Sequence, residues 1–452
     1  MKKIDTMFFL SLPVICTLPI SLCSLQANDY KDEKEKIKDY CLFDYIKLTG
    51  RQNAQIEGDL IPLKNSAIKQ GYAIKYTTGG YSIFSNKYKL IYMVNPFGYF
   101  YMPSTVNFLN NFYGRNNDDV TTFDKPVPGD HKRPPKVINP NDYVDFRKIN
   151  LKNVKNAAKQ EYKKYNINPI KNNFMYADYE VKHSWWFKSS TEYNYGDNVP
   201  EGSYIDNDLE QNNYWRKYPS YYTKTGYYRK TAIGICGYIA MNMLIQYNEF
   251  FNGSGYYSDF EYDKFLQFEK NFSNITANNA YYDLYHYTLP TLRSDFTNYL
   301  YQKTWFGGGV GRIWEYKYIA DSLILNKWKL GNINYKYWSP VFQTWDHPAS
   351  YIRDYGVPTA IGGNYAYINK NTNDYGGHVI VAYGAYKHDH RFLANFGWTK
   401  TYSQVVLYPS NWNDVIAIKH IKGQPLKKVF NWENELYSGP MMTEILREKG
   451  II

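Results

Sequence analysis

Cys236 is the residue of this sequence with the clearest chemical potential. It lies in TAIGICGYIAMNM, residues 231–243, with glycines close on both sides and an apolar run after it. The apolar residues recur at helical spacing and predict a helix that begins near Cys236. A helix N-terminus stabilises a thiolate, so this position suits a nucleophile. Taken alone, a cysteine in an apolar helix is more often an inert core residue.

A cysteine nucleophile needs a base within reach and a third group that orients the base. His378, in YGGHVIVAYGAY, begins a predicted apolar strand and is the candidate base. Asn395, in RFLANFGW, lies on the next predicted strand, where a hairpin would set it beside the first. Its amide oxygen could accept a hydrogen bond from the imidazole and fix the tautomer. Each residue alone fits a structural role, but together they predict a Cys-His-Asn triad.

The order and spacing of these residues resemble those of papain-like cysteine peptidases. The separations are 142 and 17 residues, and the resemblance, over residues 215–415, is to the bacterial streptopain-like branch, which includes exported peptidases of wall-less bacteria. It implies an α+β fold with a two-lobed catalytic domain, one lobe helical and the other an antiparallel β-sheet. It also implies that Cys236 is the nucleophile, His378 the general base and then acid, and Asn395 the orienting group. Trp398 resembles the tryptophan that shields the His–Asn bond from water.

Lys230 departs from the family pattern. Papain-like peptidases carry a glutamine six residues before the nucleophile, and here that position is Lys230. Its ammonium could stabilise an oxyanion, or it could point to solvent. Loss of one oxyanion donor costs about 100- to 1000-fold in turnover. The alternatives to an exported endopeptidase are therefore a weak or dead papain-like scaffold that acts as a surface-binding protein, and another papain-clan amidase or acyltransferase.

The first residues predict export. Two lysines precede an uncharged run over residues 6–28, and Ala27 offers a small residue for cleavage. Residues 1–27 are therefore predicted to be a signal peptide of a secreted or cell-surface bacterial protein. A retained membrane anchor stays an alternative because the run is about long enough to span a bilayer. Lipidation of Cys23 is a further alternative.

The rest of the chain divides by composition. Residues 70–102 alternate aromatic or β-branched residues with polar ones, which predicts an antiparallel meander. This stretch resembles the propeptide β-unit of streptopain-type precursors, which implies a zymogen, and a structural accessory domain is an equal alternative. The predicted segments are a β-rich domain (28–114), a proline-rich linker (115–145), an unassigned connection (146–214) and the catalytic domain (215–452).

Charge and composition limit the partners. The net charge is +11, but the basic residues form no recognisable nucleic-acid-binding module. The predicted partner is a polypeptide substrate, with host proteins as one candidate source, and membrane attachment would run through the N-terminal segment. No cofactor is implied. His388 and His390 have metal-like spacing but no third ligand nearby, so no metal site is predicted.

Overall fold

The computed structural model describes residues 20–65, 69–86, 89–98, 155–156, 158–159, 174–189, 236–253, 257, 334–338, 346–365, 376–387, 390–397, 402–408, 412–419 and 425–452. At several helix and strand ends, Cys236 and His378 among them, it describes the backbone alone. The helices are α1 (Ile20–Thr49), α4 (Ser184–Ser189), α8 (Cys236–Phe251), α14 (Asp346–Tyr355) and α15 (Gly439–Glu448). The strands of the N-terminal part are β1 (Ile56–Asn65), β2 (Lys69–Tyr76), β3 (Tyr81–Ser85) and β4 (Leu90–Asn95). The later strands are β5 (Tyr179–Glu180), β6 (Asn334–Trp338), β7 (Thr359–Tyr365), β8 (Gly376–Ala385), β9 (Phe392–Asn395), β10 (Val405–Leu407), β11 (Trp412–Lys419), β12 (Phe430–Trp432) and β13 (Glu435–Tyr437).

One antiparallel sheet dominates the described part of the chain. It has 11 strands, ten of them in the order β1-β2-β3-β4-β10-β9-β8-β7-β11-β6, while β5 pairs with β8. The hairpin β12–β13 forms a separate small sheet. Helices pack against the large sheet, and α8 contacts β7, β8 and β11. The protein is therefore an α+β protein with an antiparallel sheet, as the sequence predicts.

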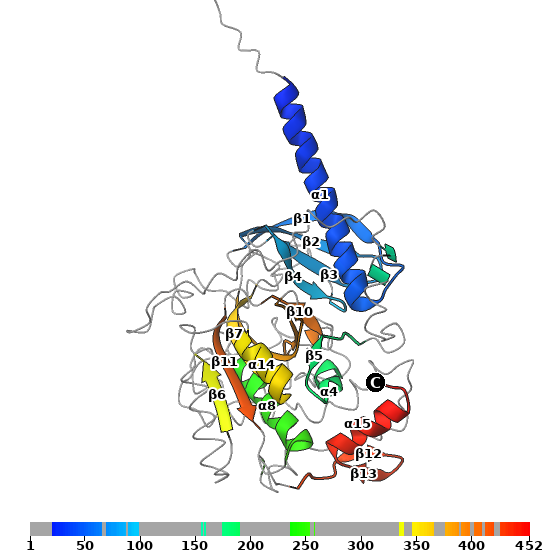
Figure 1. Ribbon diagram of the computed structural model, residues 1–452, viewed down its shortest axis with the longest axis vertical. Coiled ribbons are helices and arrows are strands. Elements are labelled where there is room, and N and C mark those ends of the chain that lie inside the picture. The colour runs from blue at the N-terminus through cyan, green and yellow to red at the C-terminus, as the bar shows by residue number, and fades with distance from the viewer. Residues whose placement is uncertain are drawn as a thin grey trace, which may run out of the picture.

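Helix α1 and strands β1–β4 form a unit, called here the N-terminal unit. The meander predicted for residues 70–102 is present as β2, β3 and β4. Helix α1 packs against β1 and β3, and its Tyr45 ring stacks on Tyr76 at 3.8 Å between centroids. The Tyr76 hydroxyl donates to the Cys41 carbonyl over 3.0 Å. The N-terminal half of α1 projects away from this unit (Figure 1).

The N-terminal unit is continuous with the rest of the sheet, which the sequence did not predict. Strand β4 pairs antiparallel with β10, with Val94 opposite Val406 and Met93 opposite Leu407. The sequence suggested a separate β-rich domain because the proline-rich stretch at 115–145, which lies outside the described residues, divides the two parts of the chain.

Residues 174–189 lie beside the end of β8. They fall in the region left unassigned in the sequence analysis, and they carry β5 and α4. Strand β5 pairs with the end of β8, where Tyr179 lies opposite Ala385. A Cβ at Gly384 would lie 2.9 Å from the Ala177 Cβ, so only glycine allows this close approach. The segment thus belongs to the same packed body as β8.

An aromatic cluster joins α4, α8 and the C-terminal part of the chain. Its rings come from α4, from α8 and from β12, and they pack mostly edge to face at centroid distances of 4.9–6.5 Å. The members are Trp185, Trp186, Phe187, Tyr247, Phe250, Phe251 and Phe430. All of them are buried, so α8 is enclosed between the sheet and this cluster.

In the part of the chain that the structure describes, no helix has both the length and the apolar character needed to cross a membrane. Of the predicted signal segment, residues 1–19 lie outside the described residues. Helix α1 begins within that segment and continues past Ala27 without interruption.

Candidate active site

Cys236 is the first residue of α8, where the sequence predicts the helix to begin. The helix has 16 residues, and Ile239, Met243 and Tyr247, which recur at helical spacing after Cys236, are at most 2% exposed. The backbone N–H groups of a first helical turn have no partners within the helix. Cys236 therefore lies at the end of α8 where a negative charge is stabilised.

His378 and Asn395 lie on neighbouring strands of the sheet. His378 is on β8, in register with Gly363 of β7. Asn395 ends β9 and lies opposite Val381, three residues along β8 from His378. The hairpin β8–β9 that the sequence predicts is therefore present, and it sets the two residues on adjacent strands.

The Asn395 side chain is buried, and its amide bonds to two backbone groups on different segments. It is 1% exposed. Its Nδ2 donates to the Phe187 carbonyl oxygen over 2.8 Å, and its Oδ1 accepts the Gly397 backbone N–H over 2.7 Å. These partners assign the orientation of the amide, because a carbonyl oxygen accepts and an N–H donates.

Gly397 connects the Asn395 turn to the helix that begins at Cys236. Its φ is +69°, which glycine adopts without strain. A Cβ added there would lie 2.6 Å from Ile239 Cγ2 and 3.1 Å from Met243 Cε. Ile239 and Met243 are in the first two turns of α8. The turn after β9 thus packs directly on the N-terminal end of α8.

Helix α4 is the element that sequence reasoning missed. The last carbonyl groups of a helix have no partners within it. In α4 the Phe187 carbonyl accepts from Asn395, and the Lys188 carbonyl accepts from Ser403 Oγ over 2.5 Å. The two side chains cap α4, which explains why Asn395 is fixed. The signal available in the sequence was the apolar SWWF stretch, which is too short to show helical periodicity.

An ion pair with a buried lysine also holds α4. Lys188 Nζ lies 2.9 Å from Glu180 Oε2, and the Lys188 side chain is 2% exposed. The Lys188 ammonium also lies 4.0 Å from the centroid of the Tyr176 ring. Burial lowers the pKa of Lys188, and the charge of Glu180 opposes this shift. Glu180 also accepts the Ala177 N–H, over 2.7 Å.

His183 is a second histidine near α8, but its surroundings are structural. Its ring stacks on Phe251 at 4.6 Å, and Nδ1 lies 2.7 Å from Thr443 Oγ1. Thr443 Oγ1 also accepts the Trp185 Nε1–H and donates to the Gly439 carbonyl. Since that hydroxyl proton is used, Nδ1 of His183 is the donor to Thr443. Burial lowers the pKa of His183 to about 3, so the ring is neutral at physiological pH.

The structure brings together the elements that carry Cys236, His378 and Asn395. Lys230 and Trp398, the predicted supporting residues, lie outside the described residues. His388 lies outside them too. Among the side chains that the structure describes, no three of His, Cys, Asp or Glu gather in a way that could hold a metal ion.

Comparison of the chain with protein-family models, curated proteins and solved structures finds no match.

Proposed function

We propose that the protein is an exported cysteine endopeptidase with Cys236, His378 and Asn395 as its triad. The observation that carries the proposal is the packing of Gly397 on Ile239, because it joins the turn after Asn395 to the first turn of the Cys236 helix. Further support comes from the hairpin β8–β9, which carries the other two residues on adjacent strands. The proposed arrangement is papain-like, with α8 and its helical surroundings as one lobe and the sheet as the other.

The proposed reaction is acyl transfer through a thioester. The Cys236 thiolate attacks the scissile carbonyl carbon, and the protonated His378 imidazole gives its proton to the leaving amine as the C–N bond breaks. Neutral His378 then takes a proton from water, and the hydroxide attacks the thioester carbonyl and releases the acid and the thiolate. The Cys236 backbone N–H supplies one donor to the oxyanion.

Asn395 would orient His378 in this scheme. Its Oδ1 accepts the Gly397 N–H, and an amide oxygen is an acceptor of the kind that an imidazole N–H needs. Its Nδ2 is anchored on Phe187, so the amide cannot turn over without losing that bond. The rigid amide would hold the imidazole tautomer in which the other ring nitrogen faces sulfur.

The test is cleavage and active-site labelling by a thiol-directed epoxide. Cys236→Ala should abolish both cleavage of an unstructured protein substrate and labelling. Cys41→Ala is the matched control, because Cys41 is a free, fully buried cysteine whose thiol pKa is raised well above its usual value by burial. The control should keep cleavage and labelling. Cleavage by Cys236→Ala would refute the proposal.

The second candidate is a surface-binding protein on an inactive papain-like scaffold. The observation that favours it is that both polar atoms of the Asn395 amide have structural partners. Those partners account for a buried asparagine without any catalytic role. A reduced protein that binds a macromolecule but never reacts with the epoxide at Cys236 would favour this candidate over the peptidase.

A further inference from the structure

The junction between the N-terminal unit and the rest of the protein is a buried part of the sheet. The residues paired across it, Met93 and Val94 on β4 with Val406 and Leu407 on β10, are all 0% exposed. The Tyr408 N–H also donates to the Tyr92 carbonyl over 2.8 Å. Figure 1 shows β4 of the N-terminal unit beside β10. Without that unit, the three-residue strand β10 would become an exposed apolar edge, which proteins avoid.

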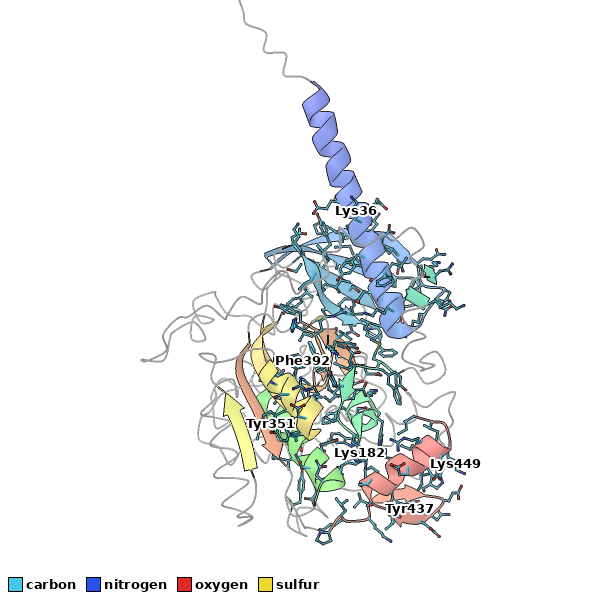
Figure 2. The ribbon with its side chains drawn as sticks, viewed as in Figure 1. Lys36, Lys182, Tyr351, Phe392, Tyr437 and Lys449 are labelled. Carbon is cyan, nitrogen blue, oxygen red and sulfur yellow. The ribbon has the colours of Figure 1, made fainter. Side chains whose placement is uncertain are left out.

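A buried ion pair crosses the same junction. Arg391, just before β9, donates through both terminal nitrogens to the Asp44 carboxylate of α1, over 2.7 and 2.8 Å. The side chains are 4% and 6% exposed. Phe392, which follows Arg391, is labelled in Figure 2. A buried ion pair that loses one partner leaves the other charge without compensation, which is strongly unfavourable.

We infer that the N-terminal unit is a permanent part of the folded protein and stays bound when the chain is cut between the two parts. The surface that binds the N-terminal unit consists of β10 and Arg391. The unit that occupies this surface consists of α1 and β1–β4 of the same chain. The backbone pairing supplies affinity, as in the addition of a strand to a sheet edge, and the bidentate ion pair fixes the register. It favours the structural accessory domain over the propeptide, the two alternatives that the sequence leaves equal, and it does not depend on the proposed peptidase activity.

The experiment uses the full chain with a site-specific protease sequence inserted between Gly129 and Asp130. The Cys236→Ala background prevents self-cleavage, so failure of this inference is distinct from failure of the proposed function. After the cut, size-exclusion chromatography at about 1 µM should give one peak that contains both fragments. The fragments should separate in about 6 M urea. Separation under native conditions would overturn the inference.

Trypsin digestion of the chain without an insertion gives a second measurement. If the inserted sequence impairs folding, brief trypsin digestion of the Cys236→Ala chain replaces the site-specific cut. The two readouts, chromatography under native conditions and in urea, stay the same.

The Asp44–Arg391 ion pair has its own test. Asp44→Asn should increase the fraction of dissociated fragments by about tenfold or more, because Arg391 loses its buried counter-charge. Glu57→Gln is the matched control, since Glu57 pairs with Lys75 on the surface of the same unit. Equal dissociation of both variants would overturn the role of the Asp44–Arg391 pair.

Discussion

The side-chain amide of Asn395 donates a hydrogen bond to the Phe187 carbonyl at the C-terminal end of α4, over 2.8 Å. One residue thus ends strand β9 and caps a helix that lies 208 positions earlier in the chain. The same amide accepts the Gly397 N–H. The proposed orienting group is therefore held by the fold before any substrate binds.

Asn395→Ala should lower stability and activity together. It leaves the buried Phe187 carbonyl and Gly397 N–H without these partners, and each such loss costs about 1–3 kcal/mol. Urea unfolding measures the stability, and peptide hydrolysis measures the activity. Asn431→Ala is the control, because the Asn431 side chain also accepts a nearby backbone N–H, that of Asn434, but in an exposed turn. A stability loss no larger than that of the control would contradict the capping role.

Gly397→Ala should be more destabilising than an alanine at a glycine with the same backbone angle. The alanine would meet a strained φ of +69° and would also press on Ile239 of α8. Gly450→Ala is the matched control, since its φ is +65° and nothing lies within 4 Å of the added Cβ. The excess cost at Gly397 should be about 1–3 kcal/mol, as for other overpacked sites. Equal unfolding free energies for the two variants would show that Gly397 does not pack tightly on α8.

The Glu180–Lys188 pair gives a prediction for a double-mutant cycle. Glu180→Gln should cost about 3–5 kcal/mol because it leaves the Lys188 charge buried without its counter-charge. The double variant Glu180→Gln with Lys188→Met should recover a large part of this loss, since no charge remains buried. Unfolding free energies of the two single variants and the double variant measure the coupling. Additive losses would mean that the two side chains act independently.

His183 predicts that stability falls in acid. Its folded pKa of about 3 lies below the ordinary histidine value of 6.5. Between these values the unfolded chain binds a proton that the folded protein does not, so stability decreases as the pH falls from about 6.5 toward about 3. Between pH 7 and pH 4.5, the titration of His183 should lower the free energy of unfolding by about 2–3 kcal/mol.

The measurement for His183 is urea unfolding at several pH values in that range. His183→Gln removes the titrating ring, so its stability should depend less on pH than that of the unaltered protein. The variant loses stability at every pH, and the slope against pH is therefore the quantity to compare. Equal slopes for the two proteins would contradict the assignment of a neutral, buried His183.

The elements that carry the proposed triad can be predicted from the amino-acid sequence. The start of α8 at Cys236 follows from a helical period of apolar residues, and β8 and β9 follow from short apolar runs separated by turn residues. These signals are local, because helical and strand periods appear within a window of several residues. The position of Asn395 beside β8 is also predicted, because two short strands joined by a turn form a hairpin.

The contacts that hold these elements in place depend on the folded protein as a whole. The N-terminal unit joins the sheet through β10, and the ion pair between Asp44 and Arg391 connects residues 347 positions apart. Helix α4 has six residues, and its cap comes from Asn395. None of these contacts has a local sequence signature. Each one joins segments that are distant in the chain, and the folded core decides which distant segments meet.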